Sequence, residues 1–219
     1  MVKRIVSIVF VLFTCTSNAQ IREIGLKTGV TNTIINIKPL DASGGITPTP
    51  YNTNYGQSFY AQLYTQFYNY QNFSLQGGVG IIEKNSDYQY KVRVGNIGDS
   101  VTINSLVETR SFFLEFNAKL KILIPELPNV VPYMLIGPQL SFLNKQSPTI
   151  PFTLAKTQVN GVLGVGTDID LKKIHVFAEY NRLLNFGSNF SRDANYEFTE
   201  KTGMFLIGLK FLIKPKNKK

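Results

Sequence analysis

The sequence predicts an all-β fold, an eight-stranded antiparallel up-and-down transmembrane β-barrel with short periplasmic turns and long extracellular loops. Three observations predict this fold. Apolar and polar residues alternate in eight segments of about ten residues, the pattern of strands in a transmembrane barrel. The connections between these segments are alternately short and long, as in outer-membrane barrels. An apolar run behind basic residues at the N-terminus indicates export.

The composition of the 219 residues favours strands. The chain contains 16 Phe, 11 Tyr and 17 Gly, which are typical of many short strands and turns. One Cys and one His exclude a disulfide-stapled mini-protein and a metal cluster held by several histidines. The formal net charge is +9, but we expect no nucleic-acid partner for an exported chain.

Residues 1–19 are predicted to be a cleaved signal peptide. Lys3 and Arg4 precede the apolar run 5–13, which is too short to span a bilayer as a helix. Ala19 ends a stretch of small residues suited to cleavage before Gln20. The alternative is a lipoprotein anchored at Cys15, which the preceding threonine disfavours. After export, we expect residues 20–213 to form the barrel in the cell outer membrane and residues 214–219 to be a basic periplasmic tail.

The first four segments are 24–31, 59–67, 73–81 and 112–121. The first and third are interrupted by glycine. The second is the clearest, because Phe59, Leu63 and Phe67 alternate with Tyr and Gln residues. The fourth adds charge, with five apolar residues on one face and polar residues on the other: Phe112, Leu114, Phe116, Ala118 and Leu120 against Glu115, Asn117, Lys119 and Lys121.

The last four segments are 133–142, 158–168, 175–181 and 204–213. In the fifth, Met134, Ile136 and Phe142 share a face opposite to Gln139 and Ser141. Glycine on the presumed inner face of the sixth and eighth suits a crowded, narrow lumen. The outward faces of all eight segments lack charge, whereas the inward faces carry Lys27, Glu115, Lys119, Lys121, Asp168, Glu179 and Lys210. This distribution indicates that the apolar face meets lipid.

The connections support the same topology. Residues 68–72, 122–130 and 169–173 form the predicted short turns, and 33–57, 83–105, 143–156 and 184–201 form the predicted long loops. An even number of strands leaves both ends of the barrel chain on the periplasmic side.

A secreted eight-stranded barrel of the lipocalin type is the structural alternative, because it alternates similarly but turns its apolar face inward. The regular connection lengths favour the membrane barrel. So does the end segment 208–213, which resembles the C-terminal signal read by barrel-assembly machinery, a partner expected during biogenesis.

The chain resembles the PorT-like outer-membrane β-barrel family of Bacteroidota. The resemblance lies in the signal ending Ala19-Gln20, in Phe113-Leu114-Glu115-Phe116 and in the Pro-Tyr and Gly-Pro pattern of residues 132–138. The family often has proline where Asn117 stands here. The resemblance implies an outer-membrane barrel along nearly the whole mature chain, and one branch of the family assists protein secretion.

No catalytic constellation, metal site or cofactor motif is predicted, so we expect that the chain is not an enzyme. The single histidine, His175, is expected beside a short periplasmic turn. Glu115 and Glu179 are predicted to pair with Lys27, Lys119 and Lys210 inside the lumen, because buried charges persist when paired. Such a network would fill the narrow interior of an eight-stranded barrel and disfavour a porin.

The predicted function is a structural or interaction role through the extracellular loops, with an envelope or extracellular protein as partner and outer-membrane lipid around the barrel. Tyrosine offers a large contact area at low entropic cost, so the candidate contact residues are Tyr51, Tyr55, Tyr88 and Tyr90. The alternative is a secreted or membrane barrel that binds, carries or modifies a lipid or another hydrophobic small molecule.

Overall fold

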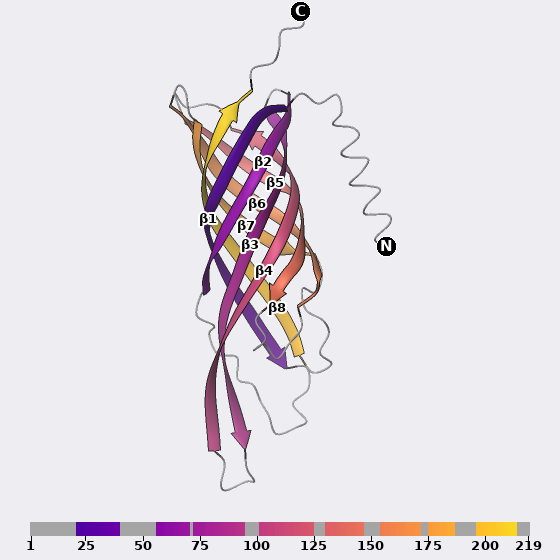
Figure 1. Ribbon diagram of the computed structural model, residues 1–219, viewed down its shortest axis with the longest axis vertical. Coiled ribbons are helices and arrows are strands. Elements are labelled where there is room, and N and C mark those ends of the chain that lie inside the picture. The colour runs from indigo at the N-terminus through magenta and orange to yellow at the C-terminus, as the bar shows by residue number, and fades with distance from the viewer. Residues whose placement is uncertain are drawn as a thin grey trace, which may run out of the picture.

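The computed structural model shows a closed antiparallel β-barrel of eight strands in chain order, with β8 paired to β1 (Figure 1). The structure describes residues 21–39, 56–70, 72–94, 101–124, 130–146, 154–171, 175–186 and 196–213. The strands are β1 Ile21–Pro39, β2 Gly56–Tyr70, β3 Phe73–Val94, β4 Val101–Leu123, β5 Val130–Gln146, β6 Thr157–Asp170, β7 His175–Asn185 and β8 Tyr196–Leu212. Each predicted segment corresponds to one strand, so the predicted fold is confirmed. None of the described residues belongs to a helix that is long and apolar enough to cross a membrane.

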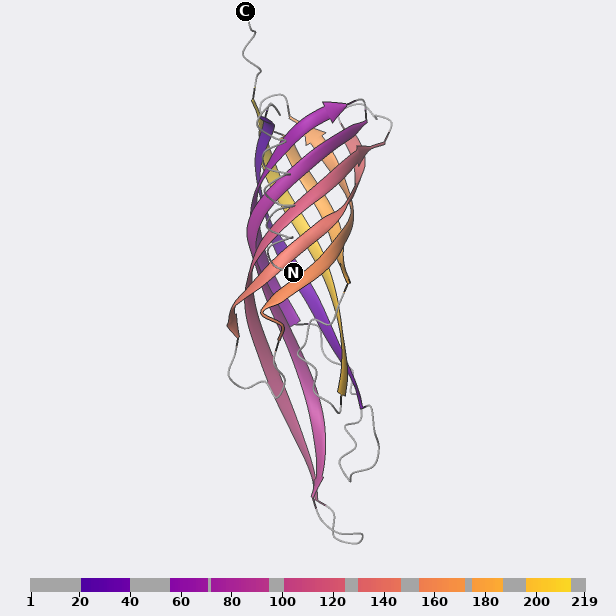
Figure 2. The same cartoon turned by 90° about the vertical axis from the view of Figure 1, so that its right-hand side faces the viewer.

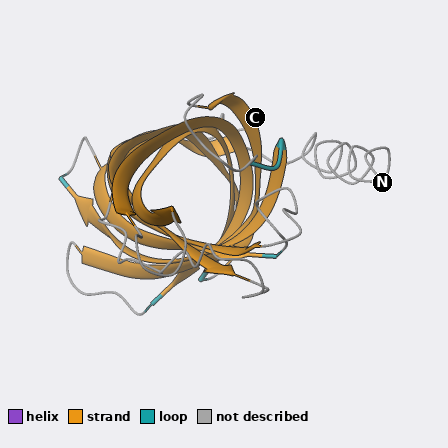
Figure 3. Cartoon of the chain, turned by 90° about the horizontal axis from the view of Figure 1, so that it is seen from below, coloured by secondary structure: helices purple, strands orange, loops and turns teal. Residues whose placement is uncertain are grey.

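The strands close into a ring, as the view along the barrel shows (Figure 3). Directly opposed residues can be followed from Glu115 through β5 to Gln158 on β6. Followed the other way, through β3, β2, β1, β8 and β7, they reach β6 at Asp168. Positions 158 and 168 are ten residues apart, so the barrel closes with a shear of ten residues. A shear of this size tilts the strands steeply to the barrel axis, as Figure 2 shows.

Burial alternates along each strand with the predicted parity. On β2, Tyr60, Gln62 and Tyr64 are buried, whereas Phe59 and Leu63 are exposed. The same alternation holds on β5, where Tyr133 and Gln139 point inward. The polar face therefore lines the lumen and the apolar face points out of the barrel. This is the reverse of the lipocalin-type arrangement.

Glycines on the inner face make room for aromatic rings from neighbouring strands. A Cβ atom at Gly25 would collide with the ring of Tyr64, and one at Gly208 would collide with the ring of Phe177. A Cβ atom at Gly166 would likewise collide with the ring of Tyr133 at 2.6 Å. The predicted crowded lumen is thus built from large rings packed on bare backbone.

The predicted long loops are shorter than expected, because residues 33–39, 83–94, 101–105 and 196–201 belong to strands. β3 and β4 continue as a two-stranded hairpin beyond the ring of the barrel (Figures 1 and 2). We call this the hairpin end, and the opposite end, where β1 begins and β8 ends, the N-terminal end. On the outward face, apolar Ile81 and Phe112 are followed by Glu83 and Arg110, which form an ion pair of 3.1 Å. These polar residues led the sequence interpretation to end the strands too early.

Candidate functional site

Among the described residues, the inner face of the barrel carries ten buried charged side chains, five lysines and five acids, whose formal charges cancel. They are Lys27, Lys84, Lys119, Lys121, Lys210, Glu23, Glu115, Asp168, Glu179 and Glu200. A buried charge is costly unless it is paired and hydrogen bonded. The arrangement of these groups therefore decides whether the lumen is a stable, filled interior.

Near the N-terminal end, Asp168 joins two lysines. Its Oδ2 atom lies 2.5 Å from Nζ of Lys121 and 2.8 Å from Nζ of Lys210. Lys210 also lies 3.5 Å from Glu23, and Nζ of Lys121 sits 3.8 Å from the ring centroid of Tyr133. These side chains come from β1, β4, β5, β6 and β8, so the cluster ties most of the barrel wall together.

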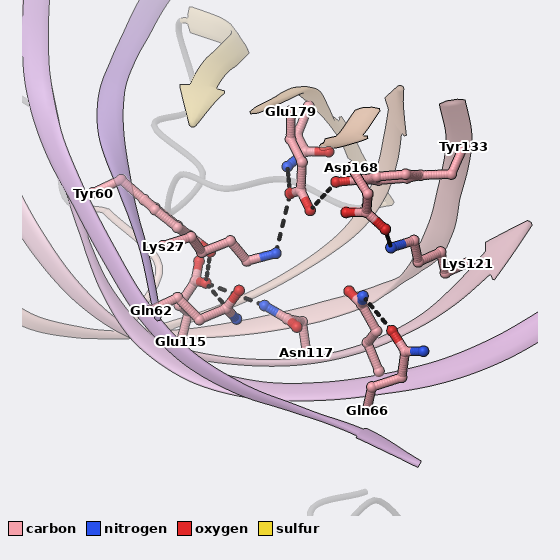
Figure 4. Close-up of polar contacts among 12 residues, drawn as sticks. Lys27, Tyr60, Gln62, Gln66, Glu115, Asn117, Lys121, Tyr133, Asp168 and Glu179 are labelled. Carbon is pink, nitrogen blue, oxygen red and sulfur yellow. Dashed lines mark hydrogen bonds and ion pairs between the residues drawn. The ribbon is translucent and has the colours of Figure 1, made fainter. Parts of the chain in front are cut away.

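Deeper in the lumen, Glu179 accepts three hydrogen bonds from side chains of three strands (Figure 4). Its Oε2 atom accepts from Nζ of Lys27 at 3.1 Å and from Nδ2 of Asn181 at 3.1 Å. Its Oε1 atom accepts from the hydroxyl of Tyr133 at 3.0 Å. Nζ of Lys27 also lies 4.9 Å from the ring centroid of Tyr64. Glu179 is thus the centre of the lumen network.

Glu115 is bonded differently from the prediction, which paired it with lysine. Its Oε1 atom accepts from three neutral donors: the hydroxyl of Tyr60 at 2.5 Å, Nε2 of Gln62 at 3.3 Å and Nδ2 of Asn117 at 3.2 Å. Its Oε2 atom has no hydrogen-bond partner among the described residues. Polar neutral groups therefore hold this carboxylate in place.

The Nζ atom of Lys119 has no hydrogen-bond partner among the described residues, although only 1% of the surface of this residue is exposed. Its ammonium is attracted by Glu179 and Glu115 and repelled by Lys27. Lys119 therefore interacts with both carboxylates through space and not through a hydrogen bond. Lys210, the third lysine of the predicted pairing, contacts Asp168 and Glu23 and not Glu115 or Glu179.

Towards the hairpin end, Lys84 forms an ion pair of 2.5 Å with Glu200 and donates to Oε1 of Gln158 at 2.9 Å. Thr202 donates to Glu200 at 2.9 Å. Lys84 and Glu200 were not predicted as site residues, because both fall within predicted loops. If the strand alternation had been extended to positions 84 and 200, it would have identified both residues as inward-facing.

Buried apolar side chains pack inside the barrel next to this ion pair. The buried cluster consists of Ile35, Tyr60, Ile82, Phe113, Leu154, Val162, Leu183, Met204 and Leu206, with Leu143 packed against it. Nζ of Lys84 lies 4.9 Å from the ring centroid of Phe113, which connects the two parts. The described inner face therefore combines a buried apolar cluster with buried charged groups.

Removing the carboxylate of Glu115 is expected to destabilise the folded barrel. In a Glu115→Ala variant the donors of Tyr60, Gln62 and Asn117 lose their common acceptor, and Lys119 loses one of two nearby negative charges. We expect a loss of about 2 kcal/mol, the order found for hydrogen bonds to a buried charged group. The urea midpoint of unfolding in detergent measures it. An unchanged midpoint would contradict a structural role for this carboxylate.

The remaining predicted residues lie outside the lumen network. Tyr51 and Tyr55 are not among the described residues, and Tyr88 and Tyr90 lie on β3 opposite Val107 and Ser105, within the extended hairpin. His175 begins β7, and its Nδ1 atom lies 3.8 Å from Asp170. No group of three or more possible metal ligands occurs among the described residues.

Comparisons with known proteins find no matching family model and no matching curated relative. Solved outer-membrane barrels of eight strands resemble the chain in backbone. The N-terminal barrel domain of OprF from Pseudomonas aeruginosa has a TM-score of 0.45 at 8% identity, covering 89% of this chain and 99% of that one. Neisserial surface protein A has a TM-score of 0.47 at 10% identity (87% and 97% covered), and Ail of Yersinia pestis has 0.42 at 12% (88% and 100%).

Proposed function

We propose that the protein spans the cell outer membrane as a barrel with a filled lumen and acts through the surface that its extracellular hairpin end presents. The observation that carries this proposal is the opposite polarity of the two barrel faces. We also propose that the chain is exported by its signal peptide and belongs to the PorT-like family. We propose no catalytic activity for it.

The outer surface supports the membrane location. Every strand contributes an apolar or aromatic side chain that is about half exposed, from 46% for Phe116 to 55% for Phe205. One such residue per strand is Leu26, Leu63, Ile81, Phe116, Ile136, Val165, Tyr180 and Phe205. Soluble monomers rarely expose apolar patches beyond a few hundred square ångströms. In a bilayer the same surface is favourable, and ring closure pairs the backbone groups internally.

The interior supports an interaction role over transport. The described inner faces are occupied by the charged network, by rings packed on glycine and by an apolar cluster. A barrel that carries a hydrophobic molecule in its lumen would need an apolar cavity there, and ten buried charges disfavour it. The hairpin formed by β3 and β4 instead extends beyond the ring, where an envelope or extracellular protein could contact it.

Membrane-extracted protein is expected to migrate as two forms in SDS electrophoresis, a compact form without boiling and a slower one after boiling. A closed barrel keeps its backbone hydrogen bonds in SDS until it is heated. In planar bilayers, the same folded protein is expected to produce no steady ionic conductance, because side chains fill its lumen.

Two results would contradict the proposal. Recovery of the protein in the soluble periplasmic fraction, with no heat-dependent shift, would contradict the membrane barrel. Steady conductance from the folded form, absent from the boiled sample used as control, would contradict the filled lumen.

A further inference from the structure

Arg182 lies on the outward, lipid-facing surface of the barrel. Arg182 is exposed on β7, between inward-facing Asn181 and Leu183. The apolar surface continues past it on the same strand, because Tyr180 on one side and Leu184 and Phe186 on the other are 51%, 43% and 68% exposed. The predicted charge-free outward face ended just before this residue. Arg182 is therefore a cation flanked on its own strand by exposed apolar residues.

Beside Arg182, Gly203 leaves a bare backbone position, and we call this position, with Arg182, Tyr180 and Asn32 around it, the notch. Gly203 on β8 lies directly opposite Arg182, and Asn32 on β1 lies directly opposite Gly203 on its other side. Gly203 adds no side chain of its own between them. The hydroxyl of Tyr180 reaches towards this glycine, since a Cβ atom placed there would lie 3.0 Å from it. Three polar side chains from two strands, β7 and β1, thus border one bare backbone position on β8.

A second cation completes the group. Lys201 is exposed on the outward face of β8, two residues from Gly203. No hydrogen bond or ion pair joins the side chain of Arg182 or Lys201 to a described residue. Cations on a lipid-facing surface are unfavourable unless they reach an anion or the polar interface. Because no described residue supplies a negative charge here, an anion from the membrane would stabilise both cations.

We propose that Arg182, Lys201, Asn32 and the hydroxyl of Tyr180 bind the phosphate group of an anionic membrane lipid at the rim of the apolar band. The planar guanidinium of arginine can donate two parallel hydrogen bonds to one phosphate, and lysine adds a point charge. The amide of Asn32 and the tyrosine hydroxyl supply further donors. Exposed apolar groups beside the notch, such as Phe205 on β8, offer a surface for the acyl chains.

The position of the notch argues for a lipid and against a free phosphate ion. Apolar residues flank Arg182 along β7 and across to Leu163 on β6, which is 42% exposed. A membrane lipid brings its phosphate to this depth together with its chains, whereas a soluble anion would have to leave water. The inference rests on the proposed membrane-spanning barrel.

The test uses full-length protein refolded into vesicles of phosphatidylcholine containing phosphatidylglycerol as the anionic probe. Native mass spectrometry of the released protein counts the lipids that each barrel retains. We expect wild type to retain phosphatidylglycerol in preference to phosphatidylcholine. The R182Q/K201Q variant is expected to lose this preference by roughly tenfold, since a few charge-assisted hydrogen bonds account for such a factor. R182K keeps the charge but loses the two parallel guanidinium donors. Its preference for phosphatidylglycerol should therefore lie between those of wild type and R182Q/K201Q.

A matched control removes two exposed cations elsewhere. The R22Q/K145Q variant loses the same net charge at residues outside the notch, and it should retain lipid like wild type. Equal retention by R182Q/K201Q and the control would overturn the site. Displacement of phosphatidylglycerol by added inorganic phosphate would assign the notch to a soluble anion and overturn the lipid. Protein that does not float with the vesicles would contradict the membrane barrel itself, a distinct failure.

Discussion

Replacing Glu179 by glutamine is expected to lower the free energy of unfolding by about 3–5 kcal/mol, the range observed when one partner of a buried ion pair is removed. The substitution keeps the shape of the side chain but removes its negative charge. Lys27 then loses its ion-pair partner, and Lys119 loses one of the two carboxylates that attract it. Because the chain contains no tryptophan, the fraction of compact protein in SDS electrophoresis after incubation in urea is a suitable measurement.

A second substitution is expected to restore part of the stability that Glu179→Gln removes. In a Lys27→Met/Glu179→Gln double variant the lumen is neutral again, and methionine fills much of the volume of the lysine stem. We expect this double variant to regain at least half of the lost stability, because replacement of a whole buried pair is far less costly than loss of one partner. If the double variant were as unstable as Glu179→Gln alone, charge balance would not be the reason for the loss.

Much of the barrel could be predicted because a bilayer imposes one simple pattern on a strand. Alternation placed Glu115, Lys119 and Glu179 on the inner face, and the structure buries all three. The same rule failed at the hairpin end. There the outward residues become polar, as at Glu83 and Arg110. The sequence of a strand that leaves the membrane therefore resembles that of a loop, although β3 and β4 remain paired.

The pairing inside the lumen could not be predicted, because it depends on how the strands are staggered. Lys27 and Glu179 are 152 positions apart in sequence. They lie at the same depth only because the ring closes with its particular shear. Alternation alone gave the face of each residue but not its depth, and so Lys210 was assigned to carboxylates other than Asp168 and Glu23.

Placing arginine in the middle of the outward face should separate a membrane barrel from a soluble one. Leu63 is 52% exposed on β2, opposite Leu26 and Val79 on the adjacent strands. In a bilayer, Leu63→Arg is expected to cost about 2–4 kcal/mol, because its charge lies near the midplane of the hydrocarbon layer. On a soluble barrel, an exposed leucine changed to arginine alters stability by about 0.5 kcal/mol or less. Urea unfolding of protein reconstituted in phosphatidylcholine vesicles measures the difference.

Leu171 provides the control, because it is 58% exposed and directly follows β6 at the N-terminal end. Leu171→Arg makes the same chemical change near the interface, where the cost falls to about 0–1 kcal/mol. A large loss at Leu63 with a small one at Leu171 would show that the cost depends on depth, which only a bilayer around the barrel explains. Equal and small effects at both positions would mean that water surrounds Leu63, and the membrane-spanning assignment would then be wrong.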